Sequence, residues 1–190
     1  MTPSRRRNVL LAAGACLAVA MGYAYWLSLT PATHPDHDHG ILNLDAGGRL
    51  VVETRGGKTR NLVGKPGHAL VLHFFSTAAP GASDELAGIF LQQEALKGDS
   101  SVEFVLVAHD RDFATLDAWL KEKNLVPPFP ETLVVDPSGD ATMKLNSKRP
   151  NETMFFAADG KLASQARGSL TWPEGAAPHL AKARSGESIE

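Results

Sequence analysis

The stretch from Leu70 to Leu96 constrains the fold of this chain more than any other. It reads LVLHFFSTAAPGASDELAGIFLQQEAL, and its first six residues are apolar except for His73. A short apolar run of this kind is typical of a strand buried on both faces of a sheet. Small residues then predict a turn, and from Ser83 onward the apolar spacing predicts a helix. Functional residues often lie at such a helix N-terminus, because free N–H groups and the helix dipole converge there.

The rest of the chain supplies strands that alternate with helices. Turn residues and apolar runs predict strands over residues 41–44, 50–53, 59–62, 102–108, 132–135, 154–157 and 162–166. A helix follows the N-cap residue Asp112 and runs to Leu120. A capping box from Thr171 to Glu174 opens a last helix through Leu180. This order predicts an α/β three-layer sandwich, in which helices flank a central mixed sheet.

The residues from His73 to Ala82, HFFSTAAPGA, carry a resemblance to a known family. They are similar to the membrane-anchored thioredoxin-like (redoxin) proteins of the TlpA and ResA type, which have a Cys-x-x-Cys pair at the start of their first helix. Both cysteine positions fall on alanine here, at Ala79 and Ala82. The resemblance covers about residues 41 to 183, and it implies a thioredoxin-like sandwich with an N-terminal β-hairpin extension.

The same resemblance implies a second loop that faces the cysteine positions and usually carries a cis-proline. Counting back from the Ala158–Gly160 turn, the proline position falls on Asn151, and Pro150 stands one residue early. The resemblance therefore implies a degenerate binding groove made of Ala78, Ala79, Pro80, Gly81, Ala82, Pro150 and Asn151. It also puts His73 where thioredoxins have a buried acid. We expect a core histidine with satisfied hydrogen bonds, since there is no thiol for it to serve.

The cysteine count limits the chemistry of the chain. Its one cysteine, Cys16, lies in the N-terminal apolar segment, so no disulfide can form within the chain. Thiol–disulfide exchange needs a thiolate that attacks a disulfide sulfur, and alanine supplies neither nucleophile nor leaving group. We therefore expect no catalytic residue and no oxidoreductase or peroxidase activity, unless a partner provides the thiol.

The N-terminal part has the features of a membrane anchor. Residues 1–8 form a basic end, and residues 9–29 carry no charge and are long enough to cross a bilayer. The arginines before this segment predict a cytoplasmic N-terminus, and so a bacterial inner-membrane protein with its C-terminal domain in the periplasm. A cleaved signal peptide with a site at Ala18-Val19-Ala20 is the alternative. Residues 41–184 follow as the thioredoxin-like domain, and residues 185–190 as a disordered tail.

Residues 30–40, between the anchor and the domain, form a linker rich in histidine and aspartate. Its two prolines and lack of large apolar side chains give it nothing to bury. Imidazole nitrogens suit copper or zinc, and the candidate ligands are His34, Asp36, His37, Asp38 and His39. The alternative is a solvated tether that binds no metal, and we expect no other cofactor.

Charge and motifs narrow the function to a few hypotheses. The net charge is −2, and without the three N-terminal arginines the remainder carries −5, so nucleic-acid binding has no electrostatic basis. The first hypothesis is a redox-inactive binding or assembly module for another exported or membrane protein. The second is a periplasmic metal-handling protein that uses the linker, with His109 or His179. A diverged relative of thiol–disulfide oxidoreductases is the third, and no motif supports an enzyme with other chemistry.

Overall fold

The computed structural model describes residues 51–61, 65, 67–145, 147 and 151–187. Their centre is a mixed sheet of seven strands in the order β2-β1-β5-β4-β3-β6-β7. The strands are β1 (Val51–Thr54), β2 (Lys58–Asn61), β3 (Ala69–Phe75), β4 (Val102–Ala108), β5 (Leu133–Val135), β6 (Glu152–Phe156) and β7 (Leu162–Arg167). Strands β3, β4 and β5 are parallel, whereas β6, β7 and β1 pair antiparallel to their neighbours. All seven residues of β3 are buried, as the apolar run predicts for a central strand.

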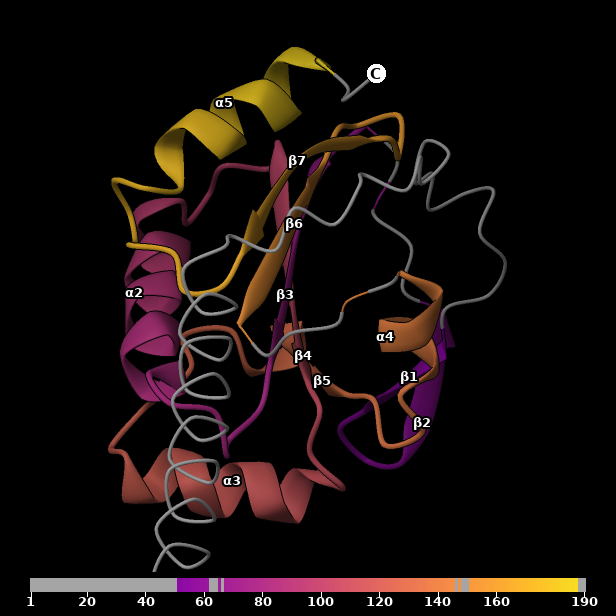
Figure 1. Cartoon of the computed structure of the whole chain (residues 1–190), viewed down its shortest axis with the longest axis vertical. Coiled ribbons are helices and arrows are strands. Elements are labelled where there is room, and N and C mark those ends of the chain that lie inside the picture. Colours follow the sequence, from indigo (N-terminus) through magenta and orange to yellow (C-terminus); the bar gives the residue numbers. More distant parts are fainter. Residues whose placement is uncertain (1–50, 62–64, 66, 146, 148–150, 188–190) are drawn as a thin grey trace, which may run out of the picture. The chain divides into compact units, whose positions relative to one another are not determined.

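Helices cover both faces of the sheet (Figure 1). They are α2 (Ala82–Ala95), α3 (Phe113–Glu122), α4 (Asp140–Lys144) and α5 (Ala177–Ser185), with a 3₁₀ turn, η1, at Pro130–Thr132. Side chains from α2, α3 and α5 pack in one buried cluster with alternate residues of β3 and β4. The other face forms a second cluster that includes Ala141 of α4 and Val52 of β1. Three layers result, as predicted.

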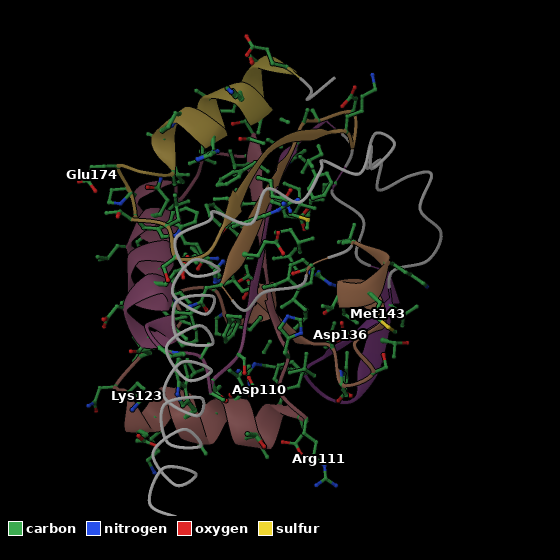
Figure 2. The ribbon with its side chains drawn as sticks, in the orientation of Figure 1. Asp110, Arg111, Lys123, Asp136, Met143 and Glu174 are labelled. Atoms are coloured by element: carbon green, nitrogen blue, oxygen red, sulfur yellow. The ribbon has the colours of Figure 1, made fainter. Side chains whose placement is uncertain are left out.

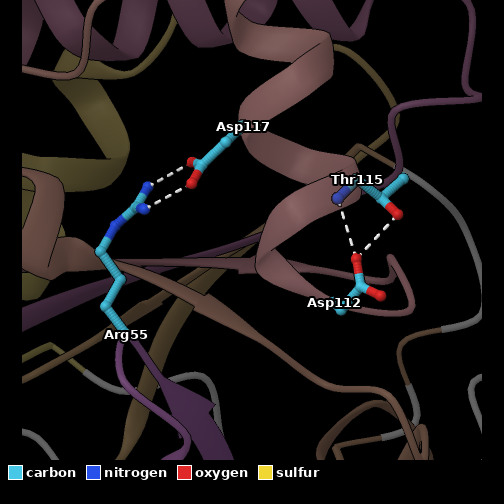
Figure 3. A network of polar contacts seen from close by, with 4 residues as sticks. All are labelled: Arg55, Asp112, Thr115 and Asp117. Carbon is cyan, nitrogen blue, oxygen red and sulfur yellow. Dashed lines mark hydrogen bonds and ion pairs between the residues drawn. The ribbon is translucent and has the colours of Figure 1, made fainter.

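The β1–β2 hairpin is tied to α3 by one ion pair. Arg55 donates to both carboxylate oxygens of Asp117, at 2.8 and 2.7 Å (Figure 3). The guanidinium carbon of Arg55 also lies 4.8 Å from the centroid of the Phe113 ring. At the start of the same helix, Asp112 accepts from the Thr115 backbone N–H at 2.8 Å (Figure 3), which confirms the predicted N-cap.

The structure confirms most predicted elements and corrects two. Helix α4 was not predicted, because a helix of five residues is too short for a periodic apolar pattern. The last helix begins at Ala177 and not at the predicted capping box. The carbonyl of Thr171 instead accepts from the Gly175 N–H at 2.8 Å and closes a separate turn. A Cβ at Gly175 would lie 2.6 Å from that carbonyl oxygen, so the turn requires glycine.

Several predictions concern residues outside the described ranges. These are the basic end, the anchor at residues 9–29, the linker at residues 30–40, the strand at residues 41–44 and Pro150. Within the described residues, no helix is both long and apolar enough to cross a membrane.

Candidate functional site

The turn between β3 and α2 is the first half of the candidate site. The Ala79 N–H donates to the Ser76 carbonyl at 2.9 Å, and the Ala82 N–H donates to the Ala79 carbonyl at 3.3 Å. Gly81 then precedes the helix with φ 78°, a left-handed conformation that favours glycine. Ala78, Pro80 and Gly81 are exposed, Ala79 is half-buried and Ala82 is buried. The turn therefore presents a small, uncharged surface to solvent.

Asn151 lies directly against this turn, and it forms the second half of the site. Its side-chain amide donates to the Pro80 carbonyl at 3.2 Å. Only 4% of the residue is exposed, and its amide oxygen has no hydrogen-bond partner among the described residues. Asn151 therefore lies against the turn, although it is 71 positions from Pro80 in the sequence.

The backbone at Asn151 also limits which residue can stand there. Its φ is 62°, in the left-handed region that asparagine tolerates better than most residues. A proline ring fixes φ near −65°, so proline cannot adopt this conformation. The backbone at position 151 therefore does not suit a proline.

His73 lies on the same face of β3 as Val71 and Phe75, which pack under α2. It is fully buried, and its Nδ1 lies 2.9 Å from the Thr153 hydroxyl on β6. Its Nε2 has no partner within the described part of the chain. The core position is confirmed, and one ring nitrogen has a hydrogen-bond partner among the described residues. Burial, together with the nearby His109, lowers the pKa of His73 to about 3, so the ring is neutral at physiological pH.

A buried carboxylate at the end of β4 holds the residues just before the turn. Asp110 accepts from the Thr77 hydroxyl at 2.5 Å and from the Thr77 backbone N–H at 3.4 Å. Asp110 lies toward the α3 end of the sheet, as does Asp136 (Figure 2). These contacts join the loop after β3 to the loop after β4, two neighbouring parallel strands. The residues are distant in sequence and belong to no motif, so sequence reasoning missed them.

The second aspartate, Asp136, organises the loop after β5. It accepts from the backbone N–H of Thr142 at 3.1 Å and from its hydroxyl at 2.9 Å. A carboxylate only accepts, so the single hydroxyl proton of Thr142 points toward Asp136. His109 Nδ1, 3.0 Å from the same hydroxyl oxygen, must therefore donate to it. Burial lowers the pKa of His109, while the charges of Asp136 and Asp110 oppose that shift.

Glu85 on α2 positions a third loop beside the turn. Its carboxylate accepts from the Leu170 N–H at 3.0 Å. A side chain at Gly81 would meet the Ser169 hydroxyl at 3.8 Å, which puts Ser169 next to the turn. Burial raises the pKa of Glu85, and the Leu170 N–H opposes this by stabilising the charged form. The rim on this side is again uncharged, because Ser169 and Thr171 are its exposed residues.

The predicted metal ligands, His34 to His39, lie outside the described residues, so the structure does not test them. Where the chain is described, no group of three or more His, Cys, Asp or Glu side chains could hold a metal ion. His109 is hydrogen-bonded to Thr142, and His179 lies 2.6 Å from the Ser164 hydroxyl. These two histidines therefore contribute to packing between secondary-structure elements.

Comparison with known proteins gives matches in structure only. No protein-family model matches the sequence, and no curated protein matches it significantly. StoA from Bacillus subtilis is 17% identical, with a TM-score of 0.55 over 71% of this chain and 96% of StoA. A secreted disulfide oxidoreductase from Mycobacterium tuberculosis, homologous to E. coli DsbE, is 18% identical, with a TM-score of 0.55 over 71% of this chain and 95% of its own. A thiol-disulfide oxidoreductase from Bacteroides fragilis is 12% identical, with a TM-score of 0.58 over 70% and 96% of the two chains. The fold is therefore the thioredoxin-like α/β fold that thiol-disulfide oxidoreductases adopt.

Proposed function

We propose that this chain is a redox-inactive thioredoxin-fold module that binds another exported polypeptide at the groove between the Ala79–Ala82 turn and Asn151. The observation that carries the proposal is the contact from the Asn151 amide to the Pro80 carbonyl, at 3.2 Å. It joins the two segments that the TlpA/ResA resemblance pairs across a substrate groove. Both positions that would hold sulfur in that resemblance carry a methyl group.

The composition of the rim supports a polypeptide as the ligand. Among the described residues, its exposed members are small and uncharged, and they come from two loops: Ala78, Pro80, Gly81, Ser169 and Thr171. The amide oxygen of Asn151 is buried and has no partner among the described residues.

The cellular setting belongs to the same proposal. The uncharged segment at residues 9–29 would hold the module in the bacterial inner membrane, with the described domain in the periplasm. A membrane tether raises the effective concentration of the module toward any partner in the same membrane. A groove with a low intrinsic affinity for its partner can then suffice for binding.

One other reading rests on a specific observation. The fold is shared with thiol-disulfide oxidoreductases, so a diverged oxidoreductase relative is the second candidate. Such a protein would need a partner to provide both sulfurs, because the only cysteine of the chain is Cys16 in the N-terminal apolar segment. Insulin reduction by the wild-type chain above the rate without protein would favour this candidate.

Site-specific photo-cross-linking tests the binding proposal. The full chain is produced in cells with p-benzoylphenylalanine at Pro80 and, in a second variant, at Ala78. The matched control carries the same residue at Lys123, which is exposed at the end of α3 (Figure 2). We expect one adduct of defined mass from positions 80 and 78 and none from position 123. No adduct at either groove position, or the same adducts at all three, contradicts the proposal.

A further inference from the structure

A cavity of about 410 Å³ lies at the other end of α2, away from the groove. It is lined by the end of α2 and the residues after it, the start of β4 and the residues before β5. Helix α2 has 14 residues, so about 20 Å of helix separates the cavity from the Ala79–Ala82 turn. The cavity is therefore independent of the proposed function, and its volume is in the range that small-molecule sites occupy.

A buried amide in the wall of this cavity has one unused atom. Gln93 is 3% exposed, and its side-chain nitrogen donates to the Thr132 hydroxyl at 3.1 Å. That hydroxyl donates in turn to the Phe129 carbonyl at 2.8 Å, so toward Gln93 it can only accept. This chain fixes the orientation of the amide and leaves its oxygen as a buried acceptor with no partner among the described residues. An unpartnered buried acceptor is costly, and a ligand with a donor would remove that cost.

The other walls indicate the rest of the ligand. The rings of Phe104 and Phe129 line the cavity, and they suit an apolar planar group. Arg60 and Lys65 line it too, and the Arg60 Nε is a buried donor without a described partner. These two cations suit a carboxylate.

Three acids also line the cavity, and they match the cations Arg60, Lys65 and Lys97 in number. Asp99 is paired with Arg184 and accepts from Ser101, and Glu103 accepts from the Lys65 N–H at 2.9 Å. Glu131 lines the cavity as well and is exposed. Two of the three carboxylates are therefore engaged by the protein itself.

We propose that this cavity binds a small planar organic anion that carries an N–H or O–H donor. The donor would meet the Gln93 amide oxygen, the ring would lie beside Phe104 and Phe129, and the carboxylate would face Arg60 and Lys65. The site does not involve the groove at Asn151, so the two binding functions can be tested separately.

Indole-3-acetate is a suitable probe, because it combines a ring N–H, an aromatic body and a carboxylate. The full chain in lipid nanodiscs is titrated by calorimetry, with empty nanodiscs as the blank. We expect saturable binding with a dissociation constant below about 1 mM. The wild-type chain should bind 1-methylindole-3-acetate, which lacks the N–H, about tenfold more weakly, as the loss of one buried hydrogen bond predicts. Absence of saturable binding, or equal affinity for the two probes, overturns the proposal.

Two variants locate the site without relying on a single substitution. Gln93→Leu should weaken indole-3-acetate about tenfold and remove the preference over the methylated probe. The control is Gln92→Leu, at a neighbouring position that does not line the cavity. It should change neither the affinity for indole-3-acetate nor the preference over the methylated probe. Lys65→Met, at an exposed position, should weaken indole-3-acetate and leave the uncharged indole-3-acetamide unchanged. Unaltered binding of indole-3-acetate by Lys65→Met and a folded Gln93→Leu would place the probe elsewhere and overturn the assignment.

Discussion

The two buried aspartates, Asp110 and Asp136, differ from the pair His73 and Asn151 in how fully their hydrogen bonds are made. Asp110 and Asp136 accept from backbone N–H groups and from hydroxyls, and both hold a loop in place. His73 and Asn151 each make one hydrogen bond and keep one buried atom without a described partner. The aspartates are thus structural supports of the site. Asn151 keeps a buried, unpartnered acceptor beside the turn, whereas the unpartnered Nε2 of His73 lies inside the core.

This difference predicts unequal losses of stability on substitution. Removing a well-satisfied buried carboxylate leaves its donors unpaired, which costs the desolvation of each donor. Removing a half-satisfied polar group costs less, because the folded chain already carries an unpaired atom.

The largest expected effect is that of Asp136→Ala. It leaves the Thr142 N–H and hydroxyl without their acceptor, so the free energy of unfolding should fall by about 3 kcal/mol. Denaturant titration followed by circular dichroism measures this change. Glu174→Ala, at an exposed carboxylate, is the control and should change stability by less than about 0.5 kcal/mol. If Asp136→Ala lowers the free energy of unfolding by less than about 1 kcal/mol, the contrast between the aspartates and the pair His73 and Asn151 does not hold.

The next effect is a pH dependence caused by His73. Its pKa is about 3 in the folded chain and about 6.5 when unfolded, so the unfolded chain binds more protons between these values. Stability should fall as the pH drops below 6.5, by about 2 to 3 kcal/mol at pH 4.5, with no contribution from His73 above pH 6.5.

The double variant His73→Leu/Thr153→Val removes both members of the hydrogen-bonded pair and should flatten this part of the pH profile. Thr153→Val alone keeps the buried imidazole, so it is the matched control and should retain the slope. Chemical unfolding at pH 7.0, 5.5 and 4.5 gives the comparison. If the double variant keeps the full slope, other groups cause the acid sensitivity.

The smallest effect should come from Asn151→Gly. Glycine adopts a positive φ without strain and removes the unpartnered oxygen, but the bond to the Pro80 carbonyl is lost. We expect the gain from the relieved backbone and the removed oxygen to offset the loss of the hydrogen bond, so the free energy of unfolding should change by less than about 1 kcal/mol. Asn124→Gly is the control, because Asn124 is exposed and also has a positive φ, 54°. A loss above about 2 kcal/mol relative to that control would mean that Asn151 is a structural support like Asp136.

The sequence by itself determined most of the elements of this protein and half of its candidate site. The apolar run of β3, the N-cap at Asp112 and the turn before α2 are local patterns, and local patterns can be read without a partner segment. The position of Asn151 opposite the turn followed from the family resemblance, which encodes a tertiary contact.

Only the tertiary structure decided which polar groups are satisfied. The contacts of Thr77 with Asp110 and of His73 with Thr153 join segments 33 and 80 residues apart, and no spacing rule links them. The same holds for Gln93. Its amide nitrogen donates to Thr132, 39 residues away, and this contact leaves the amide oxygen without a described partner. Hydrogen-bond satisfaction depends on three-dimensional neighbours and on burial, and neither is a property of a stretch of sequence.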